Sequence, residues 1–356
     1  MFKKVIFISN GHKGGANKYI EQHMQYIKKG KKYLLDDDPK KNYDNLVLKS
    51  IKWHKVKVLK DAFYFKKTIT KIIEDEKNNT NTLIFVTNFA IIIKYFFFFF
   101  KIKNKGVKIC LTLHSGLLQI KLRNLAAAFI FSFFINIIDV LIFGSNSSKK
   151  WWFTFFPWMS LKKNRVIFNG IEKRKVNMKK INPNKIKTTF IGRIEKENDP
   201  HLFCRIAESF SNSKKTKNIK FNIYGEGKLK RDILKYNKIV KFHSWTKTSK
   251  IYSSSDIVLI TSYVNNFPYV ALEAKSFGLP VISCSKGDIK YIIKNNNDGY
   301  LTLERKVDVI SKLIFKAIKN YKSLNRNALK NVTSFDVRKS CKKIWKYILD
   351  ANNNNR

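Results

Sequence analysis

The sequence predicts an α/β protein built from two doubly wound, Rossmann-like domains. Strand-like and helix-like segments alternate along the whole 356-residue chain, as they do where parallel strands are joined by helices. A chain of this length is about twice the usual size of one domain, and the alternation restarts after a polar stretch near the middle. With 44% hydrophobic residues, the chain can build packed cores, which excludes a wholly disordered protein.

Short apolar runs predict the strands of the first half. The first run is followed by glycines and by a helix that has Ile20, Met24 and Ile27 on one face and ends at Gly30. A second helix is predicted by apolar residues at helical spacing: Ala62, Phe65, Ile69, Ile72 and Ile73. The expected strands are KVIFIS (4–9), TLIFVT (82–87), VKICLTL (107–113), DVLIFGS (139–145) and NRVIFNGIE (164–172).

A polar, charged stretch that carries Pro183 separates the halves and has the composition of a linker. The strand pattern then restarts with IKTTFIGRI (186–194), IKFNIYG (219–225), KIVKFHSW (238–245), DIVLITS (256–262) and PVISCS (280–285). We expect an N-terminal domain over residues 1–170, a linker over 171–185, a C-terminal domain over 186–334, and over 335–356 a helix that packs back on the N-terminal domain and ends in a disordered tail.

Two long apolar runs are not expected to span a membrane. Residues 90–100 are too few and include Lys94, whereas residues 125–143 contain Asn136 and Asp139, and a charge near the centre of such a span is costly. We interpret the second run as a buried helix followed by a strand. The first residues have too short an apolar core for a signal peptide.

The cysteines predict neither a disulfide framework nor a zinc site, because Cys110, Cys204, Cys284 and Cys341 lie far apart in the sequence. We therefore expect a cytoplasmic protein with no structural metal.

The charge balance is extreme but does not by itself identify a partner. Lys and Arg number 71 against 25 Asp and Glu, a formal net charge of +46, which suits nucleic acid, an anionic membrane or phosphorylated small molecules. Lys, Asn, Ile, Phe and Tyr are over-used together, however, and this favours a coding bias as the source of part of the excess. No nucleic-acid recognition module is visible, so a nucleic-acid-binding protein is only an alternative.

Polar and glycine residues directly after strands are the candidate functional positions, because ligands of doubly wound sheets bind beyond the carboxyl ends of the strands. Gly14 and Gly15 follow the first strand, and their backbone N–H groups suit an anion. Their spacing matches neither the dinucleotide fingerprint nor a P-loop, so an ordinary tight turn is an alternative. His114 also follows a strand, with a purely structural role as its alternative. The run DDDP at 36–39 favours a solvated turn over a metal site.

The ordered motifs of the second half resemble a known family. IGRIEKENDPHLF, FNIYGEGKLKRDI, VKFHSWT, IYSSSDIVLITS and NNFPYVALEAKSFGLPVIS occur in this order, and SNGHKGGANKYI, LTLHSG, DVLIFGSNSS and VIFNGI agree in the first half. Together they resemble the GT-B-fold retaining glycosyltransferases of the group 1, or family 4, type. The resemblance runs from about residue 2 to residue 349 and implies two Rossmann-like domains facing a central cleft, with the acceptor on the N-terminal side and the nucleotide sugar mainly on the C-terminal side.

The resemblance implies roles for individual residues. Arg193 matches the arginine that contacts the donor phosphates, and a guanidinium suits that task because it stays charged. Glu273 matches the second glutamate of an E-x7-E signature, which holds the ribose hydroxyls. The other matching positions are His114 near the transferred sugar, Gly14 and Gly15 near phosphates and acceptor, Glu226 on the base and ribose side, and the sugar-cradling loop of Asn266, Phe267, Pro268 and Tyr269.

Two positions depart from the family pattern. The second phosphate contact is usually a lysine five residues after the arginine, but here it is Asn198, with Lys196 as a candidate replacement. The first glutamate of E-x7-E is Asn265. Asparagine donates and accepts hydrogen bonds but supplies no charge. Either the family geometry is retained around these residues, or the site is rebuilt around amides, and a catalytically impaired binding protein is an alternative function.

The resemblance also implies the reaction: transfer of a sugar from a nucleotide-diphospho-sugar, a UDP-sugar being favoured, to a glycan or lipid-linked acceptor with retention of configuration. The family needs neither a protein nucleophile nor a cofactor, and it serves surface polysaccharide or lipopolysaccharide biosynthesis.

An aromatic and basic region between residues 95 and 165 predicts contact with an anionic membrane surface. Between Lys101 and Arg165 the sequence has eleven Lys and Arg but a single acid, Asp139, together with YFFFFFKIK and KKWWFTFFPWMSLKK. Aromatic rings flanked by cations suit the headgroup region. We expect Trp151, Trp152 and Trp158 to carry this contact, the alternative being that these rings pack in the core.

Overall fold

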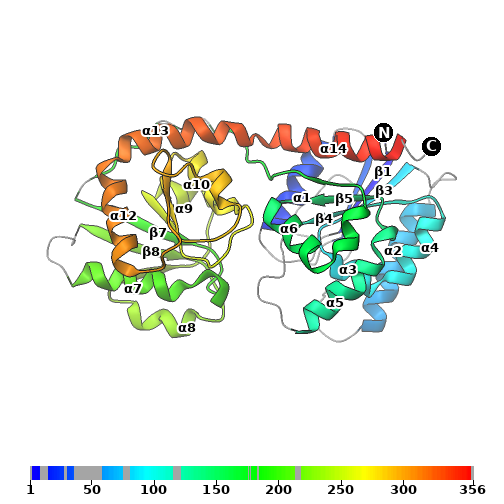
Figure 1. Cartoon of the computed structure of the whole chain (residues 1–356), viewed down its shortest axis with the longest axis horizontal. Coiled ribbons are helices and arrows are strands. Elements are labelled where there is room, and N and C mark those ends of the chain that lie inside the picture. Colours follow the sequence, from blue (N-terminus) through cyan, green and yellow to red (C-terminus); the bar gives the residue numbers. More distant parts are fainter. Residues whose placement is uncertain are drawn as a thin grey trace. The chain divides into compact units, whose positions relative to one another are not determined.

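A computed structural model describes most of the chain and divides it into two units. Unit 1 is Met1–Asn169 with Arg338–Arg356, and unit 2 is Gly170–Val337. Each holds one six-stranded sheet in which all recorded strand pairs are parallel (Figure 1), which confirms the α/β, doubly wound prediction. The described residues are 2–8, 15–27, 30–35, 58–74, 81–114, 122–174, 176, 178–182, 184–212 and 218–353.

Unit 1 has the strand order β2-β1-β3-β4-β5-β6. The strands are β1 (Lys4–Ile8), β2 (Lys31–Leu35), β3 (Thr82–Val86), β4 (Lys108–Leu113), β5 (Val140–Phe143) and β6 (Asn164–Val166). The helices are α1 (Gly15–Tyr26), α2 (Val58–Glu74), α3 (Phe89–Lys94), α4 (Phe96–Asn104), α5 (Leu122–Phe133), α6 (Asn146–Phe155) and α14 (Val337–Asn353), with short 3-10 turns η2 (Ile135–Ile137) and η3 (Pro157–Leu161).

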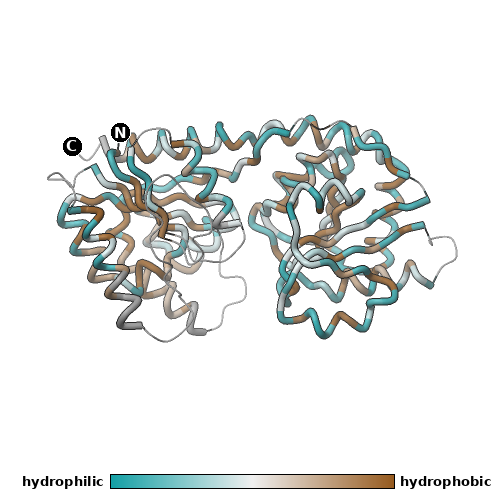
Figure 2. Tube along the Cα trace, turned by 180° about the vertical axis from the view of Figure 1, so that it is seen from behind, coloured by the Kyte–Doolittle hydropathy of each residue, from teal (hydrophilic) through white to brown (hydrophobic). Residues whose placement is uncertain are grey.

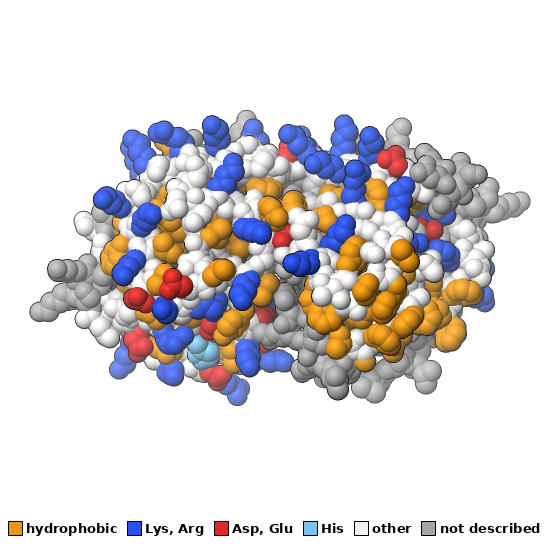
Figure 3. Space-filling view, viewed as in Figure 1, with side chains coloured by type: hydrophobic (Ala, Val, Ile, Leu, Met, Phe, Trp, Pro, Cys, Tyr) orange, Lys and Arg blue, Asp and Glu red, His pale blue; other side chains and the backbone are white. Residues whose placement is uncertain are grey.

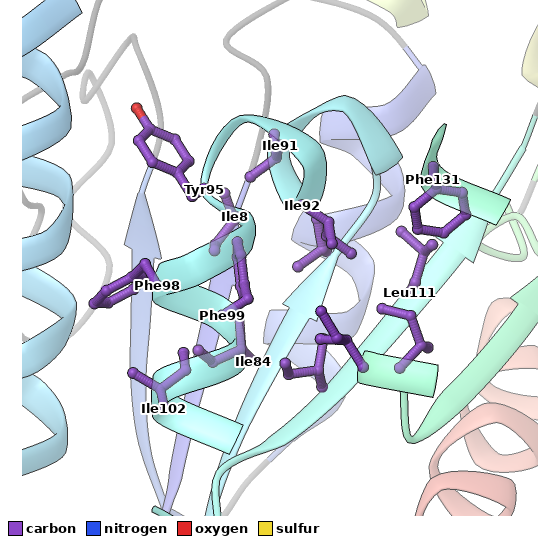
Figure 4. Packing of buried hydrophobic residues seen from close by; sticks show 14 of the residues in the cluster. Ile8, Ile84, Ile91, Ile92, Tyr95, Phe98, Phe99, Ile102, Leu111 and Phe131 are labelled. Carbon is purple, nitrogen blue, oxygen red and sulfur yellow. The ribbon is translucent and has the colours of Figure 1, made fainter. Parts of the chain in front are cut away.

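The core of unit 1 explains why its strands are readable in the sequence. The central strands β1, β3, β4 and β5 are buried on both faces and are therefore nearly continuous apolar runs, which Figure 2 shows as hydrophobic stretches inside the unit. Figure 4 shows Phe99 and Ile92, from α4 and α3, packed beside Ile84 and Leu111 of the sheet. The second apolar run forms α5 and then β5, as predicted. No helix in the described ranges is long and apolar enough to cross a bilayer.

Unit 2 has the strand order β12-β11-β10-β7-β8-β9, which reverses direction between β7 and β10. Its strands are β7 (Ile186–Ile191), β8 (Ile219–Tyr224), β9 (Val240–His243), β10 (Ile257–Ile260), β11 (Val281–Ser283) and β12 (Gly299–Leu301). Its helices are α7 (Pro200–Ser211), α8 (Lys230–Ile233), α9 (Thr248–Ser253), α10 (Tyr269–Ser276), α11 (Ile289–Ile292), α12 (Val307–Lys319) and α13 (Tyr321–Asn331), with 3-10 turns η4 (Lys196–Asn198), η6 (Leu234–Tyr236) and η7 (Val332–Phe335).

The chain passes between the units twice. The predicted linker, residues 171–185, belongs to unit 2. Two of its residues pack there: the Arg174 guanidinium lies 4.7 Å from the Phe277 ring centroid, and Lys179 pairs with Asp256 at 2.9 Å. From Arg338 onward α14 belongs to unit 1. Within unit 1, the Trp345 indole of α14 donates a hydrogen bond to His23 Nδ1 of α1 at 3.1 Å.

Candidate active site

The candidate site of unit 2 lies where the order of its strands reverses, which is where doubly wound sheets bind ligands. The loop after β7 (192–199) and the loop after β10 (261–268) leave the sheet at this point. Asn198 joins them: its carbonyl oxygen accepts from the Thr261 hydroxyl at 2.9 Å, and its Oδ1 accepts from Ser262 Oγ at 3.1 Å. Its Nδ2 donates to the Arg193 carbonyl at 2.7 Å. Both polar atoms of this amide are therefore used in holding the loops together.

The cations of the first loop are exposed. Arg193 is 70% exposed at its side chain and pairs with Glu197 at 2.8 Å. An exposed ion pair contributes little to stability, so an anionic ligand can compete with the carboxylate for the guanidinium. Lys196 is also exposed, at the start of η4. The two cations that sequence analysis assigned to donor phosphates are therefore accessible on one loop.

Glycines allow the loop after β8 to pack directly on the Arg193 loop. A Cβ on Gly225 would lie 1.9 Å from the Gly192 carbonyl oxygen, and one on Gly227 would lie 2.3 Å from that of Ile194, so a side chain at either position would collide with backbone. Between them, Glu226 is exposed and pairs with Lys230 at 2.8 Å, while its carbonyl oxygen accepts from the Ile194 N–H at 2.9 Å. The backbone of Glu226 thus lies against the loop that carries Arg193.

Asn265 also uses its amide inside the protein. Its Nδ2 donates to Ser285 Oγ at 2.8 Å, and that hydroxyl donates to the Ser262 carbonyl at 2.7 Å. The loop after β10 is thereby joined to the loop after β11. Gly287, with φ +106°, is needed in the latter, because a Cβ there would lie 2.4 Å from the Asn265 carbonyl oxygen.

The residues after Asn265 form a constrained turn into α10. Phe267 is buried and has φ +91°, a conformation that costs a bulky residue energy and is maintained only where the surroundings enforce it. Its ring contacts Phe335 at 5.6 Å. Pro268 follows as the N-cap residue, so that Asn266 to Tyr269 pass from this strained turn into the first turn of the helix. Backbone strain of this kind is concentrated at ligand-binding loops.

Glu273 lies in the middle of α10 and is buried. Its Oε2 accepts a hydrogen bond from the Tyr252 hydroxyl at 2.8 Å. Burial, together with the nearby carboxylate, raises the pKa of Tyr252 well above its usual range, so this hydroxyl remains a donor. Tyr252 therefore orients the carboxylate that sequence analysis assigned to ribose. Sequence reasoning did not identify Tyr252, whose single cue is its position in IYSSSD.

Arg305 is a second residue that the motifs did not reveal. Its Nη2 donates to Asp199 Oδ2 at 2.7 Å and to the Thr261 carbonyl at 2.6 Å. Its Nη1 donates to the carbonyls of Ser262 at 3.2 Å and Cys284 at 3.3 Å. One guanidinium thus ties together the loops after β7, β10 and β11. No spacing rule could have revealed it, because most of its acceptors are backbone carbonyls far away in the sequence.

The remaining predicted residues belong to unit 1. Gly15 opens α1, whereas Gly14 and the DDDP run lie outside the described residues. The imidazole of His114 packs against Gly144, where a Cβ would lie 2.5 Å from His114 Nδ1. Burial lowers the pKa of His114 to about 4, so the ring is neutral at pH 7. Its Nε2 is buried and has no hydrogen-bond partner among the residues that the structure describes.

No metal centre is present in the described part of the chain, where no three His, Cys, Asp or Glu side chains are placed to share an ion.

Comparison with known proteins identifies the family of the second unit. Residues 172–332 match the family described as glycosyl transferases group 1. Unit 2 is a group 1 glycosyltransferase domain. An Escherichia coli relative, UDP-Gal:alpha-D-GlcNAc-diphosphoundecaprenol alpha-1,3-galactosyltransferase, is 27% identical over 176 residues, which are 46% of this chain and 45% of the relative. An uncharacterized 41.2 kDa protein in the cps region of Klebsiella pneumoniae is 27% identical over 149 residues, 39% of each chain. The chain therefore aligns with less than half of either relative.

Solved structures extend the likeness to the whole chain. Anabaena HepE in complex with UDP and glucose has a TM-score of 0.74 at 16% identity, over 98% of this chain and 100% of that chain. Sucrose-phosphate synthase from Thermosynechococcus elongatus has a TM-score of 0.76 at 14% identity, over 98% of both chains. The apo lipopolysaccharide outer core galactosyltransferase WaaB has a TM-score of 0.69 at 15% identity, over 98% of this chain and 99% of that chain. The GT-B fold predicted from the motifs is confirmed.

Proposed function

We propose that the protein is a retaining glycosyltransferase that takes a sugar from a UDP-sugar and transfers it to a glycan or lipid-linked acceptor. The observation that supports this most is the pair of exposed cations, Arg193 and Lys196, on a loop fixed to the switch point of a group 1 domain. A charged donor close to the departing diphosphate stabilises the negative charge that develops as the glycosidic bond breaks. The leaving phosphate oxygen then takes the acceptor proton on the same face, so that no side chain acts as nucleophile.

The other residues have binding roles in this proposal. Glu273, oriented by Tyr252, accepts hydrogen bonds from the ribose hydroxyls. The strained turn at Phe267 presents backbone groups to the transferred sugar, and neutral His114 offers its unpartnered Nε2 to a sugar hydroxyl. Glu226 lies on the base and ribose side. The reaction requires no metal or other cofactor, and the four buried free thiols suit a cytoplasmic site of action.

Known relatives support the choice of substrates. The HepE structure holds UDP and glucose, and the Escherichia coli relative is named for a UDP-sugar donor and an acceptor linked to diphosphoundecaprenol. The Klebsiella pneumoniae relative is encoded in a cps region, and WaaB acts on the lipopolysaccharide outer core. We therefore propose a role in surface polysaccharide or lipopolysaccharide biosynthesis.

Turnover of nucleotide sugars by the purified full chain tests the proposal. We expect UDP release from one UDP-sugar in a panel, unaffected by EDTA, and a product whose anomeric configuration, read by NMR, is that of the donor. Arg193→Gln removes a charged hydrogen-bond donor worth about 1.5–3 kcal/mol and should lower kcat/KM roughly 10–150-fold. The matched control, Arg205→Gln, changes an exposed arginine on α7 and should not lower it.

A donor-binding protein without turnover is the second candidate, favoured by the internal use of both Asn198 and Asn265. Binding of UDP with no release from any sugar nucleotide would support it. Tight RNA binding without turnover would instead support a nucleic-acid-binding protein.

A further inference from the structure

One surface of unit 1 is unusually apolar and is formed by side chains from α4, α5, α6 and η3. Figure 3 shows hydrophobic side chains gathered on unit 1 around the helix that Figure 1 labels α5, whereas those of unit 2 are interspersed with cations. Soluble proteins seldom expose a large contiguous apolar area without a binding role. We call this surface the aromatic face; its members are Phe97, Phe100, Phe129, Ile130, Phe133, Phe134, Phe155, Trp158 and Leu161.

Ring contacts show that neighbouring members of the aromatic face form continuous clusters. Trp158 stacks on Phe133 with centroids 5.2 Å apart and lies 6.3 Å from Phe129. Phe96, which lies 5.4 Å from Phe97, contacts Phe134 at 4.1 Å. Phe133 of the first cluster and Phe134 of the second are adjacent in the chain. Beside them is an open hollow of about 370 Å³ lined by Leu125, Ala126, Phe129, Phe155 and Phe156.

Core packing accounts for only part of the aromatic sequence. Trp152 is fully buried against Phe89 and Phe131, and Trp151 is half-buried, so the expectation that these two indoles reach a membrane is not supported by their positions. The side chains that remain outside are different ones. Phe97 is 84% and Leu161 is 89% exposed, far more than a contribution to the core would require.

Charge indicates which partner covers the aromatic face. Lys101 lies one helical turn after Phe97, and Lys163 lies two residues after Leu161; both lysines are exposed. The single acid between residues 101 and 165, Asp139, is nearly buried and pairs with Lys103 at 3.3 Å. A second copy of this chain would bring the same positive charge against itself, whereas an anionic lipid surface would neutralise it.

We propose that the aromatic face docks unit 1 on an anionic bilayer, with its rings at headgroup depth and its lysines against lipid phosphates. Exposed aromatic rings beside lysines are the side chains that partition into this layer. Docking itself does not depend on sugar chemistry; only its use, the presentation of a lipid-linked acceptor to the enzyme, rests on the proposed function.

Sedimentation of the full chain with vesicles tests the proposal. The vesicles are phosphatidylcholine alone, or phosphatidylcholine with phosphatidylglycerol, and no sugar nucleotide is present. We expect strong binding only to the anionic vesicles, reduced about tenfold for each of Phe97→Ser and Leu161→Ser, and about fivefold for Lys163→Gln. The matched controls Leu303→Ser and Phe315→Ser remove exposed apolar side chains of unit 2 and should bind as the wild type does.

Three outcomes would overturn the proposal: Phe97→Ser and Leu161→Ser variants that bind like the wild type, equal binding to both kinds of vesicle, or no vesicle binding. In the last case, a dimer in light scattering that these substitutions dissociate would assign the aromatic face to a second copy of the chain. Circular dichroism and UDP binding verify that each variant is folded. A variant that loses vesicle binding but still turns over a soluble acceptor separates docking from the proposed catalysis.

Discussion

Asn198 offers the most direct test of whether the site has been rebuilt around amides. Its Nδ2 bond to the Arg193 carbonyl is exposed, so we assign it the lower end of the usual range, about 0.5 kcal/mol, and the part-buried bond from Ser262 about 1 kcal/mol. Asn198→Ala should therefore destabilise unit 2 by about 1.5 kcal/mol, which lowers Tm by roughly 3–6 °C for a unit of this size.

Asn198→Lys restores the residue that the family pattern has at this position. A lysine can still donate to the Arg193 carbonyl, but it cannot accept from Ser262, so we expect a loss of about 1 kcal/mol and no gain in turnover. Scanning calorimetry and UDP release measure the two effects, and the Asn198→Ala/Ser262→Ala double-mutant cycle isolates the shared bond. A lysine variant as stable as the wild type that turns over tenfold faster would refute the reasoning, because position 198 would then be a phosphate contact that has lost its charge.

Three further predictions concern polar groups that are buried or half-buried. Burial lowers the pKa of His23 to about 3 and that of His114 to about 4, both below the usual value of 6.5. Below about pH 6.5 the unfolded chain therefore binds more protons than the folded protein, and the free energy of unfolding should fall by about 2 kcal/mol for each histidine at pH 5. Equal urea midpoints at pH 7 and pH 5 would contradict this. Tyr252→Phe removes the Tyr252 hydrogen bond that orients the Glu273 carboxylate and should weaken UDP binding in calorimetry about tenfold. Unchanged affinity would mean that Glu273 does not hold the ribose. Arg305→Gln removes most of the hydrogen bonds by which the guanidinium joins the loops after β7, β10 and β11. It should lower the free energy of unfolding, measured with urea, by about 2–4 kcal/mol. An unaltered urea midpoint would show that these loops are stable without Arg305.

Most of the strands that the sequence revealed are buried on both faces; the partly exposed edge strands β6 and β9 are exceptions. Runs such as TLIFVT and DVLIFGS are uninterrupted because helices cover both sides of a parallel sheet. The other two edge strands, β2 and β12, were not predicted: β2 opens with two lysines, and β12 is the short segment GYL, which begins with glycine and has no β-branched residue. Gly30, interpreted as the end of a helix, also permits the turn into β2 at φ +87°.

The candidate site was predictable where one motif places several residues on one loop, as around Arg193. It was not predictable where a side chain acts through the backbone of distant segments. Arg305 binds carbonyls that tertiary structure alone brings within reach. The aromatic run shows the same limit: Trp152 is buried and Phe155 is exposed, although residues three apart lie on the same side of a helix, so tertiary packing rather than helical spacing decides which of them is buried.

The return of the chain to unit 1 after residue 337 affects the order in which the protein folds during synthesis. Unit 2 is one continuous segment and is complete once Val337 has left the ribosome, whereas unit 1 lacks α14 until the last part of the chain emerges. Until then, His23 lacks the Trp345 indole that pairs with it, and the apolar side chains that α14 covers stay exposed. The first segment of unit 1 is therefore made before unit 2 but gains α14 only after unit 2, and incompletely covered apolar surface of this kind promotes aggregation while the neighbouring unit is synthesised.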